Sequence, residues 1–293
     1  VLLDLKGKDK PNQISENAID IIKKSDPPLL VERSRIDHIK PGNLDDDFDE
    51  IKDADWVIEA VVERIDIKHK LYSQIDKVRS PNSIISSNTS TIPLSILTQE
   101  MSDTMKADFC ITHFFNPVRF MRLLEIVETP TMNKDKMSGL RDFCQNELGK
   151  GIVNCNDTPG FIGNRIGVYA MQVAMYEALE RGLPVEIADA LFGRPLGIPK
   201  TGVFGLYDLI GIDLMKDVLA SFKKELQEND PFMDVVAPHP LVEKLLEKGF
   251  NGNKGPGGFY QTTIVDDDEI VKAMNTSDMS YYDFDKVDCV IAR

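Results

Sequence analysis

The sequence predicts an α/β protein, with a mainly parallel, doubly wound sheet followed by an all-α region. Over residues 1–154, apolar segments of strand length alternate with amphipathic helical segments, the order expected when helices connect parallel strands. After Asp157 the pattern changes, and apolar residues recur at helical spacing from Phe161 to Arg181. The chain has 293 residues, 42% of them hydrophobic, which is enough to bury one large core or two modest ones.

The first segments predict a strand, a helix and a second strand. Val1–Leu5 is largely apolar and predicts a short strand. A helix is expected over Asn17–Lys24, and the two prolines of Asp26–Pro28 end it. Arg35–Ile39 predicts a further strand, which an acidic turn at Asp45–Asp47 follows.

The next segments predict the centre of the sheet. Trp56–Val62 is a nearly continuous apolar run bounded by charge, as expected of a strand that is buried on both faces. Ile67–Val78 has the apolar spacing of an amphipathic helix. Three more buried strands are expected at Ser83–Ser87, Phe109–His113 and Leu123–Val127.

The helical region is expected to begin at Thr158-Pro159, because proline is tolerated in the first turn of a helix. Further helical segments are expected around 185–194, 205–225 and 240–248. From Val265 the chain is acidic and weakly patterned, which is more typical of a linker than of a core element. We therefore expect an α/β domain over 1–154, an all-helical domain over 155–262 and an acidic linker or tail over 263–293.

Composition argues against several kinds of partner. The net charge of −14 disfavours nucleic acid, which binds basic surfaces. The chain has no apolar run of about 18 residues, so we expect no membrane span. The cysteines are scattered without a CxxC pair, which indicates no metal site, no disulfide framework and a reducing, cytoplasmic location; they are Cys110, Cys144, Cys155 and Cys289.

An acidic residue follows the apolar start of the chain. In a Rossmann-like fold, an Asp at the carboxyl end of the second strand accepts hydrogen bonds from the adenosine ribose hydroxyls, and Asp4 occupies such a place. The G-x-G-x-x-G loop expected about 20 residues upstream is missing, so we expect this chain to lack the first strand and its glycine-rich loop. A carboxylate at position 4 favours NAD over NADP, since it repels a 2′-phosphate. The alternative is an Asp that merely ends a strand.

A histidine and a glutamate form the strongest chemical signal. His113 stands at the end of a predicted strand, within the run Thr112-His113-Phe114-Phe115-Asn116-Pro117, and Glu125 follows on the next strand. A carboxylate beside a histidine fixes its tautomer and stabilises the imidazolium that forms when it abstracts a proton. The alternative for an isolated histidine is a core residue that caps a turn.

Four motifs occur in a specific order along the chain, namely Ser87-Asn88-Thr89-Ser90, the HFFNP run, Glu125 and Asp157–Arg165. Together they resemble the L-3-hydroxyacyl-CoA dehydrogenase family, and the resemblance extends from Asp4 to about Tyr260. The stretches SSNTSTIPL and RPLGIPK resemble the dehydrogenase part of long bifunctional β-oxidation proteins that also carry an enoyl-CoA hydratase region.

The resemblance implies an NAD-dependent oxidation of a (3S)-3-hydroxyacyl-CoA to the 3-oxoacyl-CoA. His113 matches the family's general base, and Glu125 matches the carboxylate that pairs with it. Ser90 and Asn164 match groups that hold the reacting end of the substrate, and Ser90 also matches a contact on the nicotinamide ribose side. A homodimer formed through the helical domain is implied as well.

Further positions match family residues that contact NAD: Asn116, Glu63, Lys68 and Lys254. Lys254 matches a lysine that closes over the cofactor from the helical domain. Each position also has a simpler interpretation. Glu63 and Lys68 could form a solvated ion pair, Ser90 could begin a turn, Asn164 could cap a helix, and Lys254 could belong to an ordinary loop.

One departure and two alternative functions complete the sequence analysis. Where the family has a Pro-Met-Gly-Pro-Phe turn, this chain has Ile198–Phe204. The first alternative is a non-catalytic descendant of the fold with a binding or structural role, against which the intact set of Ser90, His113, Glu125 and Asn164 argues. The second is a dehydrogenase that acts on free hydroxy acids.

Overall fold

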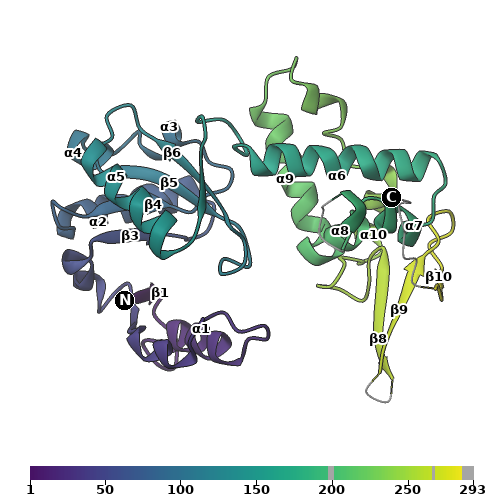
Figure 1. Cartoon of the computed structure of the whole chain (residues 1–293), viewed down its shortest axis with the longest axis horizontal. Coiled ribbons are helices and arrows are strands. Elements are labelled where there is room, and N and C mark those ends of the chain that lie inside the picture. The colour runs from purple at the N-terminus through teal and green to yellow at the C-terminus, as the bar shows by residue number, and fades with distance from the viewer. Residues whose placement is uncertain (197–200, 266–267, 286–293) are drawn as a thin grey trace. The chain divides into compact units, whose positions relative to one another are not determined.

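The computed structural model describes residues 1–196, 201–265 and 268–285, and it divides into two compact units (Figure 1). The first unit is Val1–Ile162 and the second is Gly163–Arg293. In the described part of the chain, no helix is long and apolar enough to cross a membrane.

A five-stranded sheet forms the centre of the first unit, in the order β3-β4-β5-β6-β7. All neighbouring strands are parallel except β5 and β6, which are antiparallel. The predicted Rossmann-like α/β fold is confirmed. The strands are β3 (Trp56–Glu59), β4 (Ile84–Ser87), β5 (Phe109–Phe114), β6 (Leu123–Glu128) and β7 (Gly151–Asn154).

Helices cover both faces of this sheet (Figure 1). Successive residues of a strand point to opposite faces, so Ile85 packs in one core with Tyr72 of α2, while Ile84 packs in the other with Met137 of α5. Most residues of β4, β5 and β6 are buried, as expected of strands that are covered on both faces. β3 is the last strand at one end of the described sheet and its Ile58 is 46% exposed, so the prediction that Trp56–Val62 is buried on both faces is wrong. The helices are α2 (Ile65–Val78), α3 (Leu94–Leu97), α4 (Asp103–Lys106) and α5 (Lys134–Asp142), which continues into a π-helical turn at Phe143–Glu147.

The N-terminal segment forms a separate two-stranded parallel sheet, in which β1 (Leu2–Asp4) pairs with β2 (Pro41–Asn43). The strand predicted at Arg35–Ile39 is wrong, because Arg33–His38 is a 3₁₀ helix. Only Ile36 of this helix is buried, so the segment lacks the alternation that a half-buried strand needs. The connecting elements are α1 (Gln13–Lys24) and a 3₁₀ helix at Phe48–Asp53.

Tertiary contacts decide the strand at Pro41–Asn43, which its residue types do not favour. At Gly42 a Cβ atom would lie 2.8 Å from a methyl group of Leu3, so a larger residue there would force the Leu3 side chain to move. The amide of Asn43 is held by side chains, including Asn12 at 2.6 Å. The close contact at Gly42 and the hydrogen bonds of Asn43 therefore support the pairing of β1 with β2.

The second unit is helical, as predicted, with α6 (Gly163–Glu180), α7 (Val185–Leu191), α8 (Phe204–Ile210), α9 (Ile212–Glu225) and α10 (Pro240–Glu247). Short 3₁₀ helices occur at Arg194–Leu196 and Pro231–Asp234. The segment 205–225 forms two helices rather than one. Gly211 separates the two helices. Its φ angle is +103°, which residues with a Cβ atom rarely adopt.

The chain beyond residue 262 differs from the linker that its composition predicted. A three-stranded antiparallel sheet forms there, from β8 (Tyr260–Val265), β9 (Asp268–Met274) and β10 (Tyr281–Tyr282). Figure 1 shows β8 and β9 as a long ribbon. Ala273 and Met274 are fully buried in the core of the second unit. The segment Ile198–Phe204, which differs from the family's usual turn, lies partly within residues 197–200, outside the described residues. The end of the predicted tail, residues 286–293, also lies outside them.

Two buried carboxylates hold the loops of the second unit together. Asp208 accepts hydrogen bonds from the backbone N–H groups of Phe259 (3.0 Å) and Tyr260 (2.7 Å). Asp189 accepts from the hydroxyl of Tyr260 at 2.9 Å and from three backbone N–H groups, those of residues 203–205. Burial raises the pKa of Asp208 to about 7. Asp189 and Asp208 have a structural role, because their carboxylate oxygens accept hydrogen bonds mainly from backbone N–H groups.

Candidate active site

His113 and Glu125 lie directly opposite each other on the antiparallel strands β5 and β6. Residues opposed in this way point to the same face of the sheet, and His113 Nδ1 is 2.7 Å from Glu125 Oε2. Glu125 is fully buried and His113 is 6% exposed. A carboxylate only accepts hydrogen bonds, so Nδ1 carries the proton and Nε2 is the nitrogen able to accept one.

The second carboxylate oxygen of Glu125 is also held. Its Oε1 accepts a hydrogen bond from the backbone N–H of Ile162 at 2.9 Å and faces the thiol of Cys155 at 3.7 Å. A buried charge is costly unless it is paired and hydrogen-bonded. These contacts keep Glu125 in one orientation, and Glu125 in turn orients the imidazole of His113.

Two aromatic rings flank the imidazole of His113. The ring of Phe115 lies 4.5 Å from it and the ring of Phe161 lies 5.7 Å from it, measured between centroids. Phe161 has φ +48°, in the left-handed region that costs a non-glycine residue about 1–2 kcal/mol. Strain of this kind concentrates at functional sites. The two rings give the histidine an apolar surrounding.

A second group of polar residues follows β3 and β4. Glu63 Oε1 accepts hydrogen bonds from the Thr89 hydroxyl (2.8 Å) and from the backbone N–H of Ser90 (2.9 Å). The side chain of Glu63 is 38% exposed, whereas Thr89 is 1% exposed. Asn88 Oδ1 accepts from the backbone N–H of Phe114 at 2.9 Å. The loop that carries Ser90 is thus tied to the segments after β3 and at the end of β5.

Lys68 is buried, with 1% of its side chain exposed, so the solvated ion pair is not what the structure shows. Its Nζ lies 2.7 Å from Glu59 Oε1, 3.3 Å from Glu63 Oε2 and 3.3 Å from the carbonyl oxygen of Val61. An ammonium has three N–H groups, and all three have protein acceptors here. This geometry indicates that Lys68 holds Glu59 and Glu63 in position.

The remaining predicted residues lie in different places. Asp4 is exposed at the end of β1, and its Oδ1 accepts from the backbone N–H of Leu5 at 2.7 Å. Asn116 is exposed, immediately before Pro117. Asn164 and Lys254 belong to the second unit. Asn164 is half-buried in the first turn of α6, and the Lys254 ammonium is 4.0 Å from Asp213 Oδ1.

Four further residues hold these groups in place, and the sequence pattern assigned no such role to them. Glu59 accepts hydrogen bonds from the hydroxyls of Tyr72 and Ser87 and from Lys68, which in turn pairs with Glu63. Asp157 accepts from the backbone N–H groups of Leu94 and Ser95, at 2.5 and 2.8 Å. One signal was available, because Glu59 is a charged residue inside an otherwise apolar strand, and such residues are buried only with partners.

The first unit fits a dinucleotide at the carboxyl ends of its strands, where ligands of doubly wound sheets bind. Two exposed or part-exposed polar positions lie there, namely Glu63 after β3 and Ser90 after β4. Asp4 ends β1 in the separate two-stranded sheet. Carboxylates suit the hydroxyls of ribose rather than a 2′-phosphate. The residues present therefore fit NAD.

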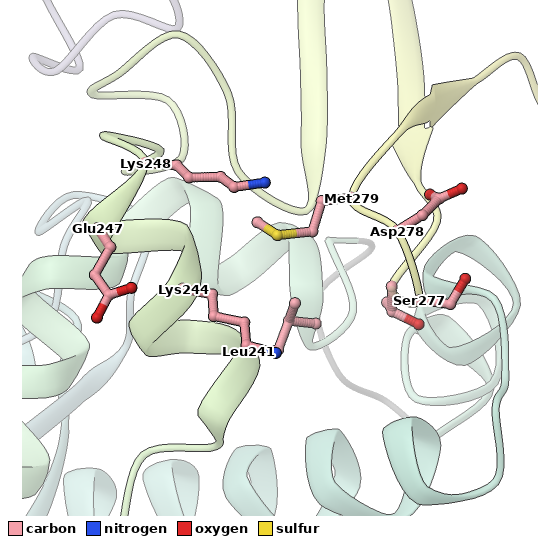
Figure 2. Close-up of a pocket in the computed structure, with 8 residues that line it drawn as sticks. Leu241, Lys244, Glu247, Lys248, Ser277, Asp278 and Met279 are labelled. Carbon is pink, nitrogen blue, oxygen red and sulfur yellow. The ribbon is translucent and has the colours of Figure 1, made fainter.

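A cavity of about 270 Å³ lies elsewhere, within the second unit, between α10 and the turn before β10 (Figure 2). Lys244 and Lys248 line it together with Glu247 and Asp278. The cavity contains none of the predicted site residues, and its charges balance. It therefore adds nothing to the site around His113.

Comparisons with known proteins match both units. The family model described as "3-hydroxyacyl-CoA dehydrogenase, NAD binding domain" matches residues 3–158, and "3-hydroxyacyl-CoA dehydrogenase, C-terminal domain" matches residues 160–262. Among solved structures, a 3-hydroxybutyryl-CoA dehydrogenase from Escherichia coli is similar, with a TM-score of 0.71 and 27% identity. The similarity covers 89% of this chain and 53% of that one.

Two curated relatives show how the chain compares in length. A putative fatty acid oxidation complex trifunctional enzyme of Rickettsia felis is 41% identical over 290 residues, which cover 98% of this chain and 40% of that protein. A probable 3-hydroxyacyl-CoA dehydrogenase of Deinococcus radiodurans is 34% identical over 265 residues, which cover 90% of this chain and 75% of that protein. Two adjoining family models and relatives that match most of the chain show that it belongs to the 3-hydroxyacyl-CoA dehydrogenase family.

Proposed function

We propose that the protein oxidises (3S)-3-hydroxyacyl-CoA to 3-oxoacyl-CoA with NAD. The observation that carries this proposal is the buried pair of His113 and Glu125, whose side chains are 2.7 Å apart. The pair leaves His113 Nε2 able to accept a proton, which is what a general base requires. The names of the relatives, which include a 3-hydroxybutyryl-CoA dehydrogenase, support the substrate class.

In the proposed reaction His113 Nε2 takes the proton of the substrate's 3-hydroxyl group. The hydrogen on C3 leaves as a hydride, for which NAD is the acceptor when bound, and the C–O bond becomes a carbonyl. Glu125 stabilises the imidazolium that forms, and the rings of Phe115 and Phe161 limit the access of water to it. In the reverse direction His113 returns the proton.

The other residues receive supporting roles in the proposal. Ser90 and Asn164 hold the reacting end of the substrate, and Ser90 also faces the nicotinamide ribose. We assign the cofactor side to Asp4, Glu63, Asn116 and Lys254. Lys68 acts on that side through its ion pair with Glu63 rather than through a contact of its own.

The proposal includes the setting of the reaction. An NAD-binding domain over 1–154 and a substrate and dimerisation domain over 155–262 follow from the family resemblance. The Rickettsia felis relative, of which the chain spans 40%, supports a role in fatty acid oxidation within a multifunctional protein. The resemblance of SSNTSTIPL and RPLGIPK to bifunctional β-oxidation proteins supports a fused hydratase region. A cytoplasmic location is supported by the cysteines, since the three described ones are free thiols.

A substrate comparison tests the proposed function. We expect the full-length protein to reduce NAD with 3-hydroxybutyryl-CoA and to be nearly inactive with free 3-hydroxybutyrate. NADH absorbance measures both rates. Turnover of the free acid alone would identify a hydroxy-acid dehydrogenase instead. Tight NAD binding without turnover of any 3-hydroxyacyl-CoA would identify a non-catalytic descendant of the family.

The Asp4 carboxylate gives a prediction about cofactor choice. We expect Asp4→Ala to lower kcat/KM for NAD by about 10- to 100-fold, because it removes charge-assisted hydrogen bonds to ribose hydroxyls. The rate with NADP should fall less or rise, since a repulsion is removed. Asp9→Ala, a change at another exposed aspartate nearby, is the control. An unchanged ratio of kcat/KM for the two cofactors would show that Asp4 merely ends a strand in solvent.

A further inference from the structure

Glu59 is a buried carboxylate at the last position of β3, with 3% of its surface exposed. Its oxygens accept hydrogen bonds from the backbone N–H of Val61 (2.7 Å), the ammonium of Lys68 (2.7 Å), the hydroxyl of Tyr72 (2.5 Å) and the hydroxyl of Ser87 (2.7 Å). Four donors, from α2, β4 and the loop after β3, therefore meet at one charge. We call Glu59, Lys68, Tyr72 and Ser87 the Glu59 cluster.

Three charges meet in and beside this cluster. The Lys68 ammonium lies between the carboxylates of Glu59, at 2.7 Å, and Glu63, at 3.3 Å. The buried Glu59 and Lys68 neutralise each other. The remaining negative charge is on Glu63, whose side chain is 38% exposed. Burial and the neighbouring carboxylate of Glu59 raise the pKa of Tyr72, so its hydroxyl stays neutral and donates a hydrogen bond to Glu59.

The Glu59 cluster and the neighbouring Glu63 hold the two ends of the segment Ser87–Ser90. The hydroxyl of Ser87 donates a hydrogen bond to Glu59, and the backbone N–H of Ser90 donates one to Glu63 at 2.9 Å. The Lys68 ammonium contacts both carboxylates. It therefore fixes the distance between Glu59, which binds Ser87, and Glu63, which binds Ser90. A displacement of Glu59 is therefore transmitted to Ser90 through Lys68 and Glu63.

We propose that Glu59 and Tyr72 are positioning residues for the dehydrogenase reaction, which act through Lys68 and Glu63 to hold Ser90 in its working position. Small displacements of a group that orients reactants lower the rate strongly. The inference rests on the proposed function, because the position of Ser90 matters only if substrate and cofactor meet there.

A charge-neutral double variant separates positioning from stability. Glu59→Gln alone leaves a buried ammonium poorly paired and should destabilise the fold. Glu59→Gln with Lys68→Met removes both buried charges, and such exchanges are often neutral for stability. We expect this double variant to unfold near the wild-type temperature, yet to lower kcat about 10- to 100-fold and to weaken NAD binding about tenfold, because Glu63 has lost its anchor.

A milder pair of variants gives the matched control. Tyr72→Phe keeps every charge and removes one hydrogen bond to Glu59, so we expect kcat to fall about three- to tenfold. Tyr176→Phe makes the same chemical change in the second unit, where the hydroxyl donates to the carbonyl of Ala237, and kcat should stay unchanged. Calorimetric NAD titration and thermal unfolding accompany the kinetics of the full-length protein.

The outcomes are distinct. A stable double variant with wild-type kcat and wild-type NAD affinity overturns the positioning role and leaves the proposed function standing. If the double variant does not fold, the decision rests on Tyr72→Phe, and wild-type kcat and NAD affinity in that variant overturn the role. A wild-type protein that turns over no 3-hydroxyacyl-CoA overturns the proposed function, and weakened NAD binding in the variants then still supports the cluster's control of the cofactor side.

Discussion

His113→Gln is expected to lower kcat by about 10²–10⁴-fold, the contribution of a well-placed general base. Glutamine is polar and close in size, but its side-chain amide does not take up a proton at neutral pH. The affinity for NAD should be nearly unchanged, since we assign His113 to the substrate's hydroxyl group. Steady-state kinetics with a 3-hydroxyacyl-CoA and calorimetric titration with NAD measure the two effects separately.

The control for this change is His69→Gln in the same unit. His69 Nε2 lies 3.0 Å from the carbonyl oxygen of Ile96, and its Nδ1 lies 3.3 Å from Glu100. Neither neighbour belongs to the proposed site, so kcat should stay near the wild-type value. A His113→Gln variant that folds and keeps more than about a tenth of the wild-type kcat contradicts the general-base assignment.

Glu125→Gln is expected to lower kcat by about 10²–10⁴-fold although it changes only one atom of the side chain. A glutamine amide can donate to His113 Nδ1, which favours the tautomer with the proton on Nε2. That nitrogen then no longer accepts the substrate's proton. The carbonyl oxygen of the glutamine can still accept from the backbone N–H of Ile162, so the fold should persist.

Two comparisons check the Glu125 result. Glu128→Gln lies on the same strand, where the carboxylate pairs with Arg141 and Lys134, and should leave kcat unchanged. The double variant His113→Gln/Glu125→Gln should be about as slow as the slower single variant, because residues that act as a unit are not additive. Additive losses in the double variant would show that the two side chains act independently, against the proposed pair.

Local sequence pattern was sufficient for the centre of the first unit. The segments beginning at Trp56, Ser83, Phe109 and Leu123 each contain consecutive apolar residues, and each contains a strand of the sheet. The contact between His113 and Glu125 follows from the same pattern, since two adjacent strands with a short connection pair as antiparallel neighbours. Burial on both faces selects mostly apolar residues, and this makes such strands predictable from the sequence.

Weaker patterns misled where few residues are buried. Arg35–Ile39 has two apolar residues, Ile36 and Ile39, that are three positions apart, and Arg33–His38 is a 3₁₀ helix in which only Ile36 is buried. β7 at Gly151–Asn154 was not predicted, since its four residues are partly exposed and include a glycine. In the second unit β9 carries an acidic start, and its strand depends on Ala273 and Met274 reaching the core.

The sequence by itself determined the α/β and helical halves, the strands that carry His113 and Glu125, and the family. Only the tertiary structure decided that Lys68 is buried and paired with Glu59, because Glu59, Tyr72 and Ser87 are brought together from β3, α2 and β4. Spacing along the chain places a charged side chain on an element but does not say how much water surrounds it. Desolvation arises from neighbours distant in sequence, and it separates a solvated ion pair from a buried one.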